Sequence, residues 1–460
     1  MKHETAIGEG AAAAAPDGLP KPRIYWAWAT LMVGLTLAVI DGTIANVALP
    51  TIAADFSTAP AASIWIVNGY QLAIVVTMLP LAALGEIHGY RRIYLGGVVV
   101  FTLASVACVL SRSLEMLTLA RIVQGLGAAG LMSVNAALLR YTVPHARFGT
   151  AIGLNALFVA LSSTIGPTLA GIMLSSLSWP WLFVINIPLG IAAIAMGLRS
   201  LPENEGSARP FDTLSALLSA LAIGLLVTSI DSAGNRIGTG IVALQAGACI
   251  VSAVLLTRRS LRMKDPLLPL DLLRIPVFTL SICTSIISFL AQLMAFISLP
   301  FLFQNVFGFP PIKVGFLMMP WPIALALVAP ISGKLSDQHS PAILGLIGLL
   351  IFAAGLALIG MLPQNPTVAD ICWRMAVCGV GFGLFQPPNN RMMISSTPRA
   401  RSGAASGMLG TARLLGQSLG AALVAFLLSQ WGVEGIPHIL VIAAGFALFA
   451  SLISLSRLGR

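Results

Sequence analysis

The sequence predicts an all-α polytopic membrane protein with fourteen transmembrane helices. Three observations predict this fold class: the composition, the recurrence of long apolar runs and the distribution of basic residues. Of the 460 residues, 57% are hydrophobic and only 9% are charged, whereas about 25% are charged in an ordinary soluble domain. A chain of this composition is suited to a lipid environment.

Apolar runs of membrane-crossing length recur along the whole chain. A helix needs about 20 predominantly apolar residues to cross the hydrocarbon core of a bilayer. The sequence contains fourteen such runs, separated by segments that carry Pro, Gly or charged residues. Because the number is even, both ends of the chain are expected on the same side. The predicted spans are residues 25–49, 62–84, 93–111, 115–139, 149–175, 181–198, 213–230, 237–257, 276–303, 312–333, 341–361, 368–388, 402–430 and 437–456.

Basic residues predict the orientation of these spans. With the N-terminus in the cytoplasm, 20 of the 26 Lys and Arg residues fall in cytoplasmic segments and four in external segments, while Arg121 and Arg413 lie within spans. The positive-inside rule therefore predicts cytoplasmic termini, and we expect the cytoplasmic (inner) membrane of a bacterium. The net charge of +10 reflects this orientation, and nucleic acid is not an expected partner.

A glycine motif in the fourth span needs a separate explanation. Residues 120–130 read ARIVQGLGAAG, in which Gly125, Gly127 and Gly130 spell G-x-G-x-x-G. A dinucleotide site would need a preceding strand and an acidic residue about 20 positions later, but no acidic residue occurs between Glu115 and Gly166. Glycines in an apolar helix more often allow another helix to approach closely. We therefore expect helix packing here.

The two halves of the chain share a sequence pattern. Residues 144–153 (PHARFGTAIG) and 398–407 (PRARSGAASG) match at an offset of 254 residues. LGEIHG and LSDQHS place Glu86 opposite Asp337 at an offset of 251, and Arg121 with its glycines matches Arg374 and GVGFG at 253. Spans 1–6 and 9–14 are therefore predicted to be two copies with the same orientation, with spans 7 and 8 as an insert.

These boundaries divide the chain into four parts. We expect a disordered cytoplasmic N-terminus over residues 1–22 and an N-terminal six-helix bundle over 23–200. A linker with two extra transmembrane helices is expected over 201–275, and a C-terminal six-helix bundle over 276–460.

Several motifs along the chain resemble one transporter family. In order, they are LAVIDGTIANVALPTI, LGEIHGYRR, RIVQGLGAAG, STIGPTLAG and WPWLFVINIPLG. Together they resemble the fourteen-helix drug:proton antiporter family of the major facilitator superfamily. Glu86, Ile87 and Ala170 depart from the family pattern. The resemblance implies a major facilitator fold, with two parallel six-helix bundles and a substrate site between them near the midplane.

Asp41 is an acidic residue in the interior of the first predicted span. A charge there costs about 2.5–3.5 kcal/mol on insertion scales, and burial disfavours the ionised form of a carboxyl group. Asp41 is therefore a candidate for exchanging a proton against substrate, although it could instead fix its helix by hydrogen bonds or a salt bridge. The resemblance suggests a role in proton transfer for Arg121, whose alternative is a structural charge partner. Asn46 joins these residues as a candidate proton-coupling or substrate position.

Other residues are candidates for gating. Gly166 and Pro167 are expected to bend the fifth span and admit a neighbouring helix, and the resemblance makes them a motif that shapes a gate. Glu86, Arg91 and Arg92 resemble a loop motif that latches helices which separate during transport. Their alternative is a set of surface charges that satisfies only the positive-inside rule.

Arg413, in the thirteenth span, permits several interpretations. It could repel cations, bind anions or satisfy backbone carbonyls at a helix contact, and the resemblance favours a structural or gating role. Asp337 with Lys334 forms a degenerate second copy of the loop motif.

The leading hypothesis is a secondary active exporter that admits a proton and expels a lipophilic, cationic compound. An alternative is an exporter of an anionic metabolite, siderophore or lipid on the same fold. The sequence lacks a Walker motif, and its five histidines are scattered, so neither an ATP-driven pump nor an enzyme is expected. We expect no cofactor other than the coupling proton. The expected partners are the bilayer and small lipophilic molecules, and the expected oligomeric state is a monomer.

Overall fold

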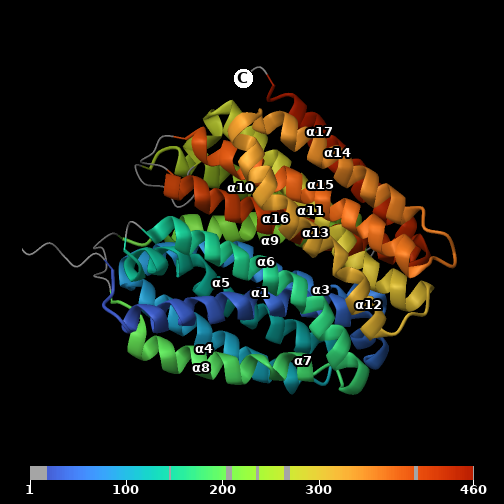
Figure 1. The fold of residues 1–460 in the computed structure, drawn as a ribbon, viewed down its shortest axis with the longest axis horizontal. Coiled ribbons are helices and arrows are strands. Elements are labelled where there is room, and N and C mark those ends of the chain that lie inside the picture. The colour runs from blue at the N-terminus through green and yellow to red at the C-terminus, as the bar shows by residue number, and fades with distance from the viewer. Residues whose placement is uncertain are drawn as a thin grey trace, which may run out of the picture.

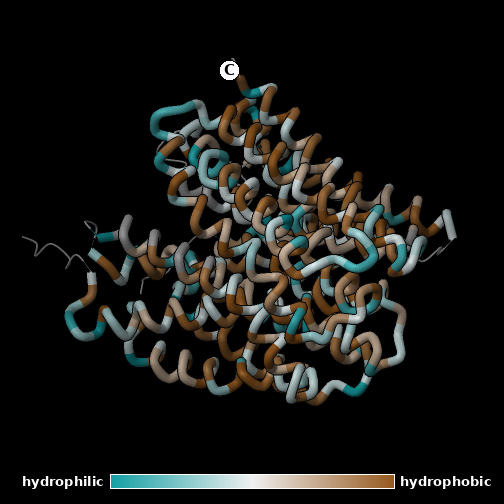
Figure 2. Tube along the Cα trace, turned by 45° about the vertical axis from the view of Figure 1, so that its right-hand side comes forward, coloured by the Kyte–Doolittle hydropathy of each residue, from teal (hydrophilic) through white to brown (hydrophobic). Residues whose placement is uncertain are grey.

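The computed structural model consists of long helices, and the described residues contain no strand. Thirteen helical segments are long and apolar enough to cross a membrane, and α6 (Phe148–Ser176) supplies the remaining predicted span. Figure 2 shows hydrophobic colour along these helices and hydrophilic colour mainly at the turns between them. The predicted fold class is confirmed. The structure describes residues 18–144, 147–203, 210–234, 238–263, 270–397 and 402–458.

Two bundles lie one above the other in Figure 1. The first consists of α1 (Arg23–Asp55), α2 (Pro60–Ser63), α3 (Trp65–His88), α4 (Tyr90–Val109), α5 (Leu114–Thr142), α6, α7 (Trp181–Val184) and α8 (Asn186–Ser200). The second consists of α11 (Pro276–Phe301), the π-helix η3 (Leu302–Val306), α12 (Pro311–Met318), α13 (Pro320–Gln338), α14 (Pro341–Gly360), α15 (Val368–Ser395), α16 (Ser402–Trp431), η5 (Val433–Gly435) and α17 (Ile436–Leu455). We call the side where α1 begins and α17 ends the terminal face, and the other side the opposite face.

Close packing around glycine repeats from one bundle to the other. A methyl group on Gly127 of α5 would lie 2.7 Å from the carbonyl oxygen of Gly97 in α4, and one on Gly381 of α15 would lie 2.7 Å from that of Gly348 in α14. The glycine motif of the fourth span is therefore a helix contact, as the sequence predicted. Equivalent contacts at both sites also show the predicted parallel repeat in space.

The repeat corrects the alignment of one arginine. Because Gly127 and Gly381 are equivalent, the offset between α5 and α15 is 254, and Arg121 corresponds to the buried residue Met375. The match of Arg121 to Arg374 was wrong by one position. Arg374 instead faces Asp370 on its own helix, with 3.6 Å between their nearest charged atoms.

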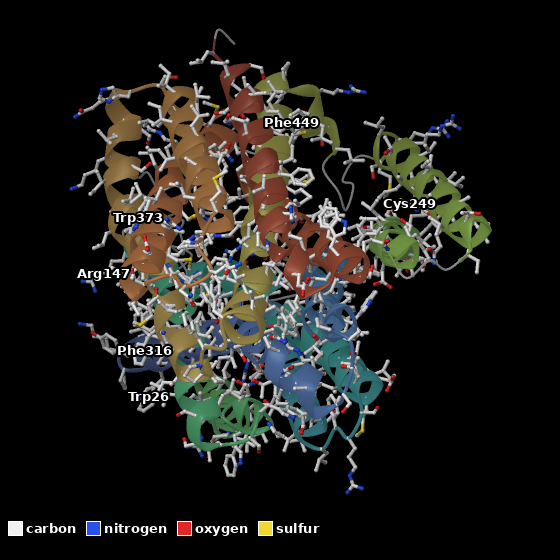
Figure 3. The ribbon with its side chains drawn as sticks, turned by 90° about the vertical axis from the view of Figure 1, so that its right-hand side faces the viewer. Trp26, Arg147, Cys249, Phe316, Trp373 and Phe449 are labelled. Carbon is white, nitrogen blue, oxygen red and sulfur yellow. The ribbon has the colours of Figure 1, made fainter. Side chains whose placement is uncertain are left out.

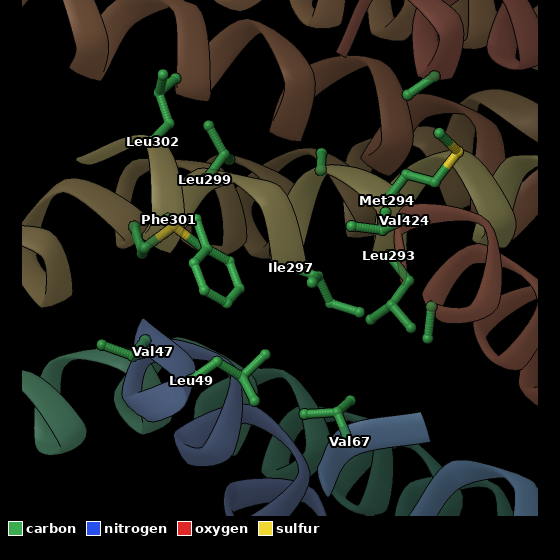
Figure 4. Packing of buried hydrophobic residues seen from close by; sticks show 14 of the residues in the cluster. Val47, Leu49, Val67, Leu293, Met294, Ile297, Leu299, Phe301, Leu302 and Val424 are labelled. Carbon is green, nitrogen blue, oxygen red and sulfur yellow. The ribbon is translucent and has the colours of Figure 1, made fainter. Parts of the chain in front are cut away.

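The bundles meet at the opposite face. Figure 4 shows Val47, Leu49 and Val67 of the first bundle facing apolar side chains of α11, among them Ile297 and Phe301. Here the Gln304 amide nitrogen of η3 donates to the carbonyl oxygen of Val47 at 2.9 Å, and the Thr51 hydroxyl donates to Gln304 at 3.3 Å. These contacts hold the bundles together at the end of α1 away from the terminal face.

The two inserted helices form a peripheral hairpin. α9 (Thr213–Gly234) and α10 (Thr239–Ser260) pack on each other, and α9 contacts both α3 and α16. Figure 3 shows this pair, marked by Cys249, beside the two bundles. The Trp65 indole donates to Asp231 at 2.9 Å. The hairpin thus touches one helix from each bundle.

The segment before α1 is only partly within the described residues. Residues 1–17 of the predicted disordered N-terminus lie outside them. The Leu19 amide donates to the carbonyl oxygen of Thr142 at 3.0 Å. This short stretch is thus held against the end of α5, which differs from the expectation of disorder up to residue 22.

We predict that Gly127→Val lowers the free energy of unfolding by about 1–3 kcal/mol, because overpacking a tight core has that cost. The measurement is thermal unfolding of the purified protein in detergent. Gly96→Val is the matched control, since Gly96 is exposed and nothing lies within 4 Å of the position of an added methyl group. Equal stability of the two variants would show that the α4–α5 contact does not limit stability.

Candidate functional site

Asp41 lies at the centre of a polar network inside the first bundle. Its side chain is 1% exposed and forms an ion pair with Arg121 of α5. The Gln124 amide donates to Asp41 Oδ1 at 3.1 Å, and the Asn186 amide donates to the same oxygen at 2.8 Å. In this conformation, therefore, Asp41 has a charge partner and two amide donors in place.

Arg121 is held on several sides. Its side chain is fully buried, Nε donates to the carbonyl oxygen of Ile66 at 3.1 Å, and one terminal nitrogen donates to Gln124 at 2.6 Å. The guanidinium carbon lies 4.1 Å from the centre of the Tyr70 ring, within the range of a cation–π contact. The second terminal nitrogen has no acceptor in the part of the chain that the structure describes. This nitrogen is free to bind elsewhere if Asp41 loses its charge.

The sequence pattern did not predict the residues that support this pair. Gln124, Asn186 and Tyr70 lie in predicted spans, but none of them was predicted to be a site residue. Their signal was a polar group at membrane depth, since Gln124 and Asn186 are uncharged amides within apolar helices. Their contacts with Asp41 and Arg121 bring together residues of four separate helices and could not be deduced from spacing.

Asn46 does not belong to this network. It is 4% exposed, and its amide oxygen has no hydrogen-bond partner among the described residues. The Gln71 amide oxygen on α3 is buried and unpartnered in the same way. Burying such a group without a partner costs about 1–3 kcal/mol, so both oxygens are candidates for binding a guest.

Gly166 and Pro167 lie where the two bundles meet. A methyl group on Gly166 would overlap the Thr43 side chain of α1, so this glycine allows α6 to lie against α1. On another side, a methyl group on Gly315 of α12 would lie 2.7 Å from the carbonyl oxygen of Pro167. One Gly-Pro pair thus contacts α1 in its own bundle and α12 in the second bundle.

The charges of the first loop motif are arranged differently from the expected latch. Arg91 forms an ion pair with Glu203, just beyond α8, and donates to the carbonyl oxygen of Leu198. Leu198 belongs to α8 and Glu203 to the start of the linker, so neither contact reaches the second bundle. Glu86 and Arg92 are exposed, and the ion pair of Arg91 within the described residues is with Glu203 and not with Glu86. The structure therefore shows Arg91 holding the chain at the start of the linker.

The second copy of the loop motif also has a different partner. Asp337 at the end of α13 forms an ion pair with Arg391 of α15. This bond lies within the second bundle, again at the terminal face.

Arg413 lies on α16 of the second bundle, apart from the Asp41 network. Its guanidinium carbon is 5.5 Å from the centre of the Phe289 ring. Its Nε is buried without a partner, and no ion pair involves Arg413 in the described chain. Within the same residues, no group of three or more His, Cys, Asp or Glu side chains could hold a metal ion.

Comparison with known proteins identifies the fold that carries this network. A model of the Major Facilitator Superfamily matches residues 31–421. The chain belongs to this superfamily. It is therefore a multi-pass membrane transporter and not an enzyme.

Relatives within the superfamily include exporters of drugs. The chain is 51% identical over 440 residues to the uncharacterized transporter YebQ of Escherichia coli, covering 95% of this chain and 96% of the relative. It is 30% identical to the riboflavin transporter RibZ of Clostridioides difficile, covering 87% of each chain. It is also 30% identical to the multidrug efflux pump LfrA of Mycolicibacterium smegmatis, covering 87% of this chain and 80% of the pump. The resemblance to drug exporters of the superfamily is confirmed.

Solved structures show the same fold at low sequence identity. A bacterial homologue of the human lysosomal transporter Spinster, in an inward-facing and unoccupied conformation, superposes with a TM-score of 0.66 at 17% identity, covering 95% of this chain and 99% of that one. A POT family transporter in complex with a thioalcohol-conjugated peptide superposes at 0.69 and 15% identity, covering 93% and 95%.

We predict that Arg121→Met lowers the free energy of unfolding by about 3–5 kcal/mol, because it leaves the buried Asp41 carboxylate without its charge partner. The combined variant Asp41→Asn with Arg121→Met should regain most of this loss, since no unpaired charge remains. Thermal unfolding in detergent measures both. A double variant no more stable than Arg121→Met would show that the arginine stabilises the bundle by some other means.

Proposed function

We propose that this protein is a proton-coupled antiporter that exports lipophilic compounds across the cytoplasmic membrane of a bacterium by alternating access. The buried pair of Asp41 and Arg121 is the observation that supports it. A carboxylate that is 1% exposed at membrane depth is costly to keep for packing alone. Binding and release of a proton once per transport cycle would give this carboxylate a function that accounts for its free-energy cost.

The network supplies a mechanism for coupling. A proton on Asp41 removes the negative charge that holds Arg121, and Arg121 then keeps only Ile66 and Gln124 as acceptors. An unpaired buried guanidinium is unfavourable, so protonation favours a conformation in which the helices around it shift. Because α1 and α5 carry the pair and α1 also contacts η3 of the second bundle through Val47, such a shift reaches the contact between the bundles.

The arrangement of the bundles supports an inward-facing state. The contacts of Gln304, Gly171 and Gly315 between the bundles all lie in the half of the molecule toward the opposite face. If both termini are cytoplasmic, as the basic residues indicate, this face is the external one. Gly166 and Pro167 then belong to a closed external gate, where their tight contacts hinder the passage of protons.

Several relatives support an exported small molecule as cargo. LfrA is a multidrug efflux pump and RibZ is a riboflavin transporter, so both relatives transport small molecules and the first exports them. We propose a single chain as the working unit, because the two bundles complete the fold without a partner.

We predict that Asp41→Asn abolishes export driven by a pH gradient, because asparagine keeps the size of the side chain but cannot carry the proton. Dye accumulation is measured in everted membrane vesicles that contain either the original protein or the variant, after a pH gradient is imposed. Glu115→Gln is the matched control, since Glu115 is exposed at the start of α5. Export by Asp41→Asn at the normal rate would rule out the carboxyl group as the coupling site.

We predict that Arg91→Gln slows turnover up to about fivefold while leaving substrate binding in detergent unchanged, because an exposed ion pair contributes about 0–1 kcal/mol. Glu203→Gln separates the two possible causes. If Glu203→Gln slows turnover equally, Arg91 acts by holding the linker. If only Arg91→Gln is slow, the arginine acts as a latch in another conformation. A loss of binding in Arg91→Gln would contradict both.

A further inference from the structure

An arginine without a hydrogen-bond acceptor or a charged partner among the described residues lies in the membrane-spanning part of the second bundle. Arg413 donates no hydrogen bond and forms no ion pair within the described residues, and its Nε is buried. A guanidinium has five N–H donors and no acceptor, so this side chain lacks the anions or carbonyls that it requires. The residue is only partly buried, so part of its surface remains open to a guest.

The contacts of α16 show where Arg413 points. One side of this helix packs on α11, where methyl groups on Gly416 and Gly420 would meet the backbone of Ile286 and Leu290. Another side packs on α3, where the Ser418 hydroxyl donates to Asn68 at 3.2 Å. These two sides are on opposite edges of α16, and at 100° per residue Arg413 lies in the half that does not contain Met408 and Ala412, which pack in a cluster with Leu256 of the peripheral hairpin. The Arg413 guanidinium carbon lies 5.5 Å from the centre of the Phe289 ring of α11. Its side chain therefore faces the interior between the bundles and not the lipid.

A polar group of the first bundle that has no hydrogen-bond partner among the described residues lies within about one helical turn of the level of Arg413. Along the antiparallel contact of α3 and α16, Ser418 meets Asn68, and Gly410 lies near Met78. Arg413 lies between Ser418 and Gly410, and Gln71 lies between Asn68 and Met78. Gln71 is 7% exposed, and its amide oxygen has no partner among the described residues. Two polar groups without hydrogen-bond partners, one from each bundle, thus lie within about one helical turn of each other along this contact.

The charges around this level favour a negative guest. Asp41, the acidic residue near the middle of the first bundle, is already neutralised by Arg121, so the pair contributes no net charge. Arg413 then leaves a net positive charge between the bundles in the described part of the chain. Planar oxyanions such as carboxylates match the guanidinium in charge and in hydrogen-bond geometry. A permanent cation would meet an unpaired arginine and no free carboxylate.

We infer that the cargo of this transporter is a lipophilic organic anion whose oxyanion group binds Arg413 and whose polar body contacts Gln71. This inference rests on the proposed export function and changes the expected charge of the cargo from cationic to anionic. Arg413 is thereby a binding residue, and the Asp41 pair carries the proton separately from it.

The first test compares two dyes of similar shape and opposite charge, fluorescein as the anion and rhodamine 123 as the cation. Binding to the purified protein in nanodiscs is measured by fluorescence anisotropy. We expect tighter binding of fluorescein, a loss of about tenfold in its affinity for Arg413→Gln, and partial recovery in Arg413→Lys. Preference for rhodamine 123, absence of fluorescein binding, or an Arg413→Gln variant with unchanged fluorescein affinity would each overturn the inference.

Transport of the same dyes distinguishes this inference from the proposed function. If fluorescein binds preferentially but an imposed pH gradient moves neither dye in everted vesicles, proton coupling fails and the assigned cargo charge stands. If the gradient moves rhodamine 123 alone, proton-coupled export stands and the assigned charge is wrong.

A second test requires no cargo. Gln417 lies one turn beyond Arg413 and is partly exposed, so Gln417→Cys in a cysteine-free background reports the local potential. We expect the anionic reagent sulfonatoethyl methanethiosulfonate to react faster than its trimethylammonium analogue, and Arg413→Gln to reduce this ratio about tenfold. Equal ratios with and without Arg413 would show that the arginine does not set the charge of this region.

Discussion

A carboxylate and a guanidinium at the centre of the first bundle constrain most of the helices around them. Asp41 comes from α1 and Arg121 from α5, while α3 supplies the Ile66 carbonyl and α8 supplies Asn186. Through Gln124, the network also reaches Ser105 of α4 at 2.8 Å. Moving any one of these helices alone would leave a buried polar group unpaired, which is expensive at membrane depth. The bundle is therefore expected to move as a unit.

The second bundle has the same framework with different chemistry. Its glycine contacts repeat those of the first bundle, but Met375 occupies the place of Arg121 and Trp321 that of Tyr70. Trp321 packs instead against Phe296 and Phe352, with ring centres 4.8 and 5.5 Å away. One copy of the repeat has thus become a polar, ionisable centre and the other an aromatic one. Such a division lets proton binding and cargo binding occur in different halves of one fold.

Much of this architecture could be predicted from sequence because a membrane simplifies the problem. Apolar length gives the spans, and a charge such as Asp41 or Arg121 stands out in an apolar helix. The partners of these charges were harder to predict, since Asn186 meets Asp41 from a position 145 residues away. Glu203 was missed as the partner of Arg91 for the same reason, at a separation of 112 residues. The repeat was misaligned at Arg374 because the last glycine of the motif is one position closer in the second copy, so that Gly130 and Gly383 give an offset of 253 whereas Gly127 and Gly381 give 254.

The separation of a neutral pair from a lone arginine has an energetic consequence. If one proton enters through Asp41 while one monovalent anion leaves past Arg413, two elementary charges move in the direction favoured by a membrane that is negative inside. Each charge gains about 2.3 kcal/mol per 100 mV, so the electrical part alone contributes about 4.6 kcal/mol per 100 mV. Exchange of one proton for a monovalent cation would gain nothing from the same voltage. In the exchange we propose, the placement of a single unpaired guanidinium thus determines whether the membrane potential or only the pH gradient drives the cycle.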